Sequence, residues 1–133
     1  MEVFQIIVLV PSAALLIFAG VSRFTKPKGS VCLDTYLADP ANDLHNDQDL
    51  ISEMRGAGGI TAVFGVIILL GIMFADFRLT SFVCSTVFYL GYAFGRGYSW
   101  INDGKPTSRT RLGFGFEAVL GTLNAICLVN ILT

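Results

Sequence analysis

The sequence predicts an all-α fold, an integral membrane four-helix bundle. Of its 133 residues, 53% are hydrophobic and only 14% are charged, whereas soluble domains are typically about 25% charged. The apolar residues gather into four stretches, each close to the roughly 20 residues that a helix needs to cross a hydrocarbon core of about 30 Å. These four predicted spans are residues 4–21, 56–75, 79–98 and 112–132. Pro11 interrupts the first span, which membrane helices tolerate because neighbouring groups satisfy the freed carbonyl.

Three connections of different length join the predicted spans into a single four-span domain, residues 1–133. The second connection, residues 76–78, is so short that the spans on either side of it must be antiparallel neighbours. The third connection, residues 99–111, holds the turn signal Asp103-Gly104-Lys105-Pro106. The first connection, residues 22–54, is a long loop within the domain.

The basic residues are distributed unevenly among these connections. Eight of the nine flank the first and third connections, namely Arg23, Lys26, Lys28, Arg55, Arg96, Lys105, Arg109 and Arg111. Cytoplasmic loops are enriched in Lys and Arg. We therefore expect an inner-membrane protein whose loops 22–54 and 99–111 are cytoplasmic and whose two termini lie outside. The formal net charge of −1 gives no basic field that would attract nucleic acid.

Ionisable residues at or within the apolar spans indicate a candidate site. Glu117 lies inside the fourth span, Arg96 lies near the end of the third, and Arg55 precedes the second. Such groups cost about 2.5–3.5 kcal/mol each to insert, so they face partners or a cavity. Residues three or four apart share one helix face, and this spacing joins Tyr89, Tyr92, Arg96, Ser99 and Asp103. We therefore expect two arginines near one buried carboxylate at the cytoplasmic mouth, with Glu53 and Asp103 at the rim.

This predicted cluster has three open interpretations. It can be a structural network of ion pairs that fixes the register of the last three helices. It can instead be a recess for an anionic or polar head group, with the tyrosines Tyr89, Tyr92 and Tyr98 nearby. The third interpretation is proton transfer or catalysis by acidic groups such as Asp103 and Glu117.

Other motifs give little support to metal, redox or hydrolytic chemistry. The three cysteines, Cys32, Cys84 and Cys127, are far apart, and the chain has no CxxC, HExxH or GxSxG motif. The acidic run around His45 lacks the spacing of a calcium-binding loop, so we expect a solvated surface there. Gly91 and Gly95 form a GxxxG pair, for which packing within the chain is favoured over dimerisation.

Motifs near three of the spans resemble a known family. They are Ser52-Glu53-Met54-Arg55-Gly56-Ala57-Gly58-Gly59, Gly95-Arg96-Gly97-Tyr98-Ser99 with Asp103-Gly104-Lys105-Pro106, and Glu117 with Gly121. Over residues 50–121 this pattern resembles the small four-helix bacterial membrane proteins of domain-of-unknown-function family 4345. The resemblance implies no established activity, but it implies a characteristic set formed by Glu53, Arg55, Arg96, Ser99, Asp103 and Glu117. The first loop is longer than the family shows, so nothing transfers to residues 32–48.

The general organisation is also broadly similar to that of DoxX-like four-helix proteins, some of which are quinone-linked redox subunits. Taken together, we expect a non-enzymatic protein that holds a polar-headed amphiphile, such as a lipid or quinone, or a partner subunit at the Arg/Glu cluster. The alternative is a small proton-coupled transporter or channel-like oligomer with Glu117 as the titrating group. Expected partners are membrane lipids, further copies of the chain or a larger membrane complex; we expect no cofactor, metal or catalytic residue.

Overall fold

The computed structural model describes residues 1–29, 41 and 46–133, and its architecture is a bundle of four long helices. They are α1 (Glu2–Thr25), α2 (Gln48–Met73), α3 (Arg78–Asn102) and α4 (Ser108–Leu132). Short 3₁₀ turns, η1 (Pro27–Gly29) and η3 (Ala75–Phe77), follow α1 and join α2 to α3. The described residues contain no strand. The prediction of an all-α four-helix fold is confirmed.

The helices extend beyond the apolar spans that predicted them. Helix α2 begins at Gln48 because the Asp47 side chain caps it, accepting hydrogen bonds from the backbone N–H groups of Asp49 and Leu50 at 3.1 Å. The first connection is therefore shorter than the predicted 22–54, and the third is shorter than 99–111. Hydropathy marks the lipid-crossing part of a helix, whereas capping residues mark its ends. Pro40, Asp43 and His45 lie outside the described residues, whereas Asp47 and Asp49 of the acidic run are described and exposed.

Three of the four helices, α1, α2 and α4, are long and apolar enough to cross a membrane. Helix α3 is equally long but carries more polar side chains. Several of these, including Ser81, Ser85 and Tyr89, are completely buried inside the bundle. Its lower hydropathy therefore comes partly from residues that face the other helices.

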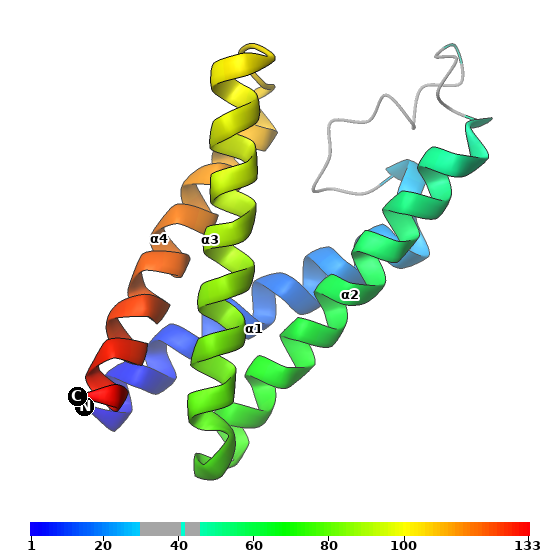
Figure 1. The fold of residues 1–133 in the computed structure, drawn as a ribbon. Coiled ribbons are helices and arrows are strands. Elements are labelled where there is room, and N and C mark those ends of the chain that lie inside the picture. The colour runs from blue at the N-terminus through cyan, green and yellow to red at the C-terminus, as the bar shows by residue number, and fades with distance from the viewer. Residues whose placement is uncertain (30–40, 42–45) are drawn as a thin grey trace.

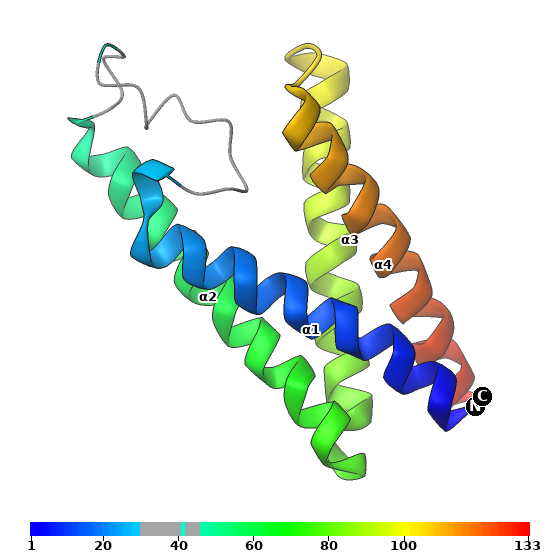
Figure 2. The same cartoon turned by 180° about the vertical axis from the view of Figure 1, so that it is seen from behind.

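The four helices form two antiparallel pairs arranged as a V (Figure 1). Helices α1 and α2 form one arm, and α3 and α4 form the other. The arms meet near the end that carries both termini and separate toward the end that carries the α3–α4 turn, as the view from behind also shows (Figure 2). The backbones of the two arms therefore diverge toward the second end.

Hydrogen bonds between polar side chains hold the arms together where they meet. The Asn124 side-chain amide on α4 donates to the Ser12 hydroxyl on α1 at 2.9 Å and accepts from the Ser85 hydroxyl on α3 at 2.7 Å. The Tyr89 hydroxyl donates to the backbone carbonyl of Ser12 at 2.6 Å. All four side chains are fully buried. Interhelical hydrogen bonds of this kind stabilise membrane bundles, so the junction of the V is fixed by specific contacts.

Small residues allow α1 and α2 to approach closely within their arm. A Cβ added to Gly20 would lie 2.3 Å from the backbone nitrogen of Ala62, and one added to Gly58 would lie 2.6 Å from that of Phe24. The glycine pair Gly91 and Gly95 on α3 behaves differently, because a Cβ on either would meet nothing within 4 Å among the described residues. The favoured interpretation of that pair, packing within the chain, is wrong: both glycines are exposed on the outside of α3.

Candidate functional site

A recess of about 420 Å³ lies between the two arms and is lined by residues of all four helices. Its walls are mainly apolar and aromatic, with Leu15, Leu16, Phe88 and Phe116 among the lining side chains. Among the described residues, the charged side chains that line it are Arg23, Arg96, Arg109 and Glu117. An apolar cavity with a few convergent polar groups is the usual form of a ligand site. We refer to this cavity as the recess.

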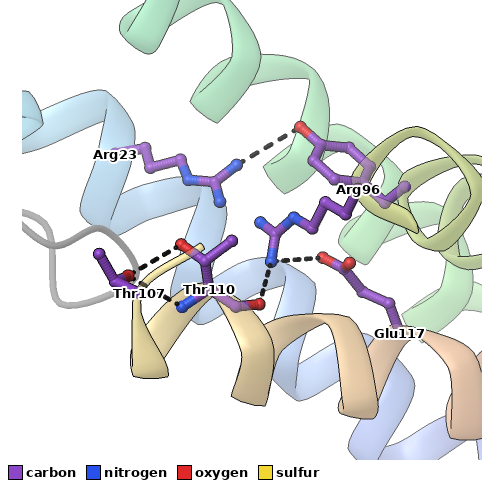
Figure 3. Close-up of polar contacts among 6 residues, drawn as sticks. Arg23, Arg96, Thr107, Thr110 and Glu117 are labelled. Atoms are coloured by element: carbon purple, nitrogen blue, oxygen red, sulfur yellow. Dashed lines mark hydrogen bonds and ion pairs between the residues drawn. The ribbon is translucent and has the colours of Figure 1, made fainter. Parts of the chain in front are cut away.

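Arg96 on α3 and Glu117 on α4 form a loose ion pair in the recess (Figure 3). Arg96 Nη1 lies 3.4 Å from Glu117 Oε1 and 3.4 Å from the backbone carbonyl oxygen of Thr110. The two side chains are 19% and 12% exposed, and Glu117 Oε2 is buried without a hydrogen-bond partner. The absence of a side chain at Gly113 makes room for this arrangement, because a Cβ there would lie 2.3 Å from Arg96 Nη1. The carboxylate is therefore only partly satisfied by its arginine.

The start of α4 is fixed by a local cap that also positions the carbonyl contacting Arg96. Thr107 precedes the helix, and its hydroxyl accepts a hydrogen bond from the backbone N–H of Thr110 at 3.5 Å. The Thr107 hydroxyl also donates to the Thr110 hydroxyl at 3.3 Å (Figure 3). Capping by threonine at this position is a common way to begin a helix.

A second arginine, Arg23 on α1, enters the recess from the opposite arm. Only 7% of Arg23 is exposed. Its Nη1 donates to the Tyr92 hydroxyl at 3.4 Å, and its Nε is buried without a hydrogen-bond partner. The Tyr92 ring lies near both arginines, with its centroid 5.9 Å from the guanidinium carbon of Arg23 and 5.5 Å from that of Arg96. Figure 3 shows the two guanidinium groups pointing into the same space.

Arg23 was not among the predicted site residues. In the sequence it lies beyond the first apolar span, which ends at Val21, so it was interpreted only as one of the basic residues that predict the orientation of the chain in the membrane. The helix in fact continues to Thr25, and Arg23 extends the buried face formed by Leu9, Leu16 and Gly20. The spacing of three and four residues from Leu16 to Gly20 to Arg23 was the signal available in the sequence.

The structure brings half of the eight predicted site residues to the recess: Tyr89, Tyr92, Arg96 and Glu117. The other four are exposed and do not line it: Glu53, Arg55, Ser99 and Asp103. Helix α3 does continue through Ser99, as the spacing predicts, but its end belongs to the part of the V where the arms have separated. Arg55 instead binds the backbone carbonyl oxygen of Phe24 near the end of α1, where a basic group stabilises a helix C-terminus.

Among the described residues that line the recess, arginine outnumbers glutamate. Three arginines and one glutamate of that part of the chain lie there. Among the described residues the ion pairs are Arg96 with Glu117 and, near the other end of the molecule, Arg78 with Glu2. Arg23 forms no such direct pair, although its charge also acts on Glu117 over a longer distance. Over the same part of the chain, no three His, Cys, Asp or Glu side chains gather as metal ligands. Guanidinium groups above an apolar wall suit the anionic end of an amphiphile.

Comparison with known proteins identifies a family. A family model described as Domain of unknown function (DUF4345) matches residues 3–128. No curated protein and no solved structure matches the chain.

Proposed function

The chain belongs to the family described as Domain of unknown function (DUF4345), and we propose that it is a non-enzymatic membrane protein that binds a polar-headed amphiphile in the recess. The observation that carries this proposal is the buried Arg23. Its side chain lies in an apolar cavity, faces a second arginine and forms no ion pair among the described residues, and its nearest acidic group there, Glu117, already pairs with Arg96. Two buried arginines that share one carboxylate leave positive charge incompletely compensated, which is expensive, and the anionic end of a bound molecule would supply the missing charge.

The lining of the recess supports an amphiphile over a small soluble anion. Arginines occupy the wider end of the V, while Leu15, Leu16 and Phe88 present apolar surface nearer the junction. Because α1, α2 and α4 have membrane-spanning character, a molecule with an apolar tail can enter between the arms from the lipid phase. The wider end also carries the two basic connections, for which the charge pattern predicts a cytoplasmic location.

Filling the recess should remove the ligand. We expect Ala19→Phe to abolish retention of a bound amphiphile, because Ala19 lines the recess and a phenyl ring would occupy it. The matched control is Ala14→Phe, on the same helix: Ala14 is exposed and lines a separate hollow on the surface of α1, not the recess. Native mass spectrometry after lipid-preserving extraction measures the outcome: a discrete bound mass in wild type and Ala14→Phe, and its loss in Ala19→Phe. The same bound mass in all three proteins, or no bound mass in any of them, would contradict the proposal.

A further inference from the structure

Two buried polar atoms in the recess lack complementary partners. In the part of the chain that the structure describes, four buried side-chain nitrogen or oxygen atoms have no hydrogen-bond partner: Arg23 Nε, Arg78 Nε, Thr86 Oγ1 and Glu117 Oε2. Two of the four, Arg23 Nε and Glu117 Oε2, belong to side chains that line the recess. One is a donor with positive charge and the other is an acceptor with negative charge. Unsatisfied buried groups are rare in native proteins and call for a specific explanation.

We infer that the ligand is a phospholipid whose phosphate binds Arg23 and whose head group also carries an N–H or O–H donor for Glu117. This inference rests on the proposed function and specifies the class of amphiphile. Each of the two unpartnered atoms then acquires the partner that its chemistry requires. An amphiphile with only an anionic end would satisfy Arg23 Nε and leave Glu117 Oε2 without a donor.

The positions of the two guanidinium groups favour a phosphate over a planar carboxylate. Arg23 reaches the recess from α1 and Arg96 from α3, so they approach the shared space from opposite arms (Figure 3). A tetrahedral phosphate offers oxygens in several directions, and arginine binds such groups with paired N–H donors. The Tyr92 ring, stacked on Phe88 with centroids 4.9 Å apart, contacts both guanidinium groups and keeps them facing this space.

Arg23 is the principal phosphate contact in this arrangement. Arg96 already shares its Nη1 between Glu117 and the Thr110 carbonyl. Among the described residues, the hydrogen bond of the Arg23 side chain is the long contact from Nη1 to the Tyr92 hydroxyl, which leaves Nε available. Glu117 Oε2, on α4, then accepts a hydrogen bond from the amine or hydroxyl group of the lipid head group.

The test compares short-chain phosphatidylethanolamine with phosphatidylcholine on the detergent-solubilised full chain. The two lipids have the same phosphate and the same charge, but the trimethylated head group of the second has no N–H donor. We expect phosphatidylethanolamine to bind roughly tenfold more tightly, as a hydrogen bond to a charged group implies. Phosphatidylglycerol, with hydroxyl donors, should also bind more tightly than phosphatidylcholine, and diacylglycerol, without phosphate, should bind most weakly.

Two variants separate the two contacts. Arg23→Gln should lower the affinity for phosphatidylethanolamine and for phosphatidylcholine by a similar factor. Glu117→Gln should bring the affinities for the two lipids close together. The comparison in wild-type protein needs no variant, so it remains decisive if Glu117→Gln does not fold. Equal affinity for phosphatidylethanolamine and phosphatidylcholine would overturn the inference that the head group donates a hydrogen bond to Glu117. Diacylglycerol binding as tight as that of either phospholipid would overturn the inference that a phosphate binds Arg23. Binding of all these lipids that is unchanged by Ala19→Phe would overturn the proposed function itself.

Discussion

Glu117→Ala is expected to destabilise the protein by about 3 kcal/mol, the lower end of the range for breaking a buried ion pair. The lower end applies because Arg96 and Glu117 retain 19% and 12% exposure. The substitution leaves two arginines in the recess without the carboxylate that offsets them. Equilibrium unfolding in mixed micelles measures the loss, with the fluorescence of Trp100, which packs against Phe114 of α4, as the signal.

Glu2→Ala is the matched control for that experiment. Glu2 also pairs with an arginine, Arg78, and at the shorter distance of 2.9 Å, but its side chain is 79% exposed. Exposed pairs contribute about 0–1 kcal/mol, so burial and not distance should decide the outcome. The double variant Arg96→Met with Glu117→Leu should recover part of the lost stability, because it removes both charges together. Equal destabilisation by Glu117→Ala and Glu2→Ala would show that the pair in the recess is not effectively buried.

Gly113→Ala is expected to weaken binding of the amphiphile by roughly tenfold to a hundredfold, the value of a charged hydrogen bond. The added methyl group would lie 2.3 Å from Arg96 Nη1 and 3.5 Å from its guanidinium carbon. The guanidinium is at the end of a flexible side chain, so it can move aside and the protein can still fold. It would then lose its place opposite Arg23. Lipid titration followed by native mass spectrometry measures the affinity.

Gly115→Ala separates that effect from the change in helix propensity. A Cβ on Gly115 meets nothing within 4 Å among the described residues. Both substitutions exchange glycine for alanine within α4 and bring the same gain in propensity, about 1 kcal/mol per residue. We expect Gly115→Ala to bind the amphiphile as wild type does. If Gly113→Ala also binds as wild type does, the position of Arg96 is not important for binding.

Much of the fold was predictable because membrane helices are marked by long apolar stretches. The pairing of Arg96 with Glu117 was also within reach, since Arg96 lies near the end of the third apolar span and Glu117 lies near the start of the fourth, which puts both at the same side of the membrane. The V shape was not predictable, because it depends on how α1 crosses the other helices. That shape leaves Ser99 and Asp103 exposed although their spacing continues the stripe of Tyr92 and Arg96.

Two further differences come from treating the apolar spans as whole helices. Arg23 lies beyond the first apolar span, yet the helix continues through it and buries it against the recess. Arg55 lies at the start of the second apolar span, yet α2 begins at Gln48, and this places Arg55 beside the end of α1 rather than in the recess. In both cases the extent of the helix, and not its hydropathy, decides where the charge lies.

Photo-crosslinking from position 19 tests the central claim most directly, that the recess holds a specific amphiphile. A photoreactive residue would replace Ala19 in the recess, and in a parallel protein it would replace the exposed Ala14 on the same helix. The proposed function predicts adducts at position 19 that are enriched in one head-group class relative to those at position 14, which samples the surrounding lipid. The same mixture of lipids at both positions, or no adduct at position 19, would contradict it.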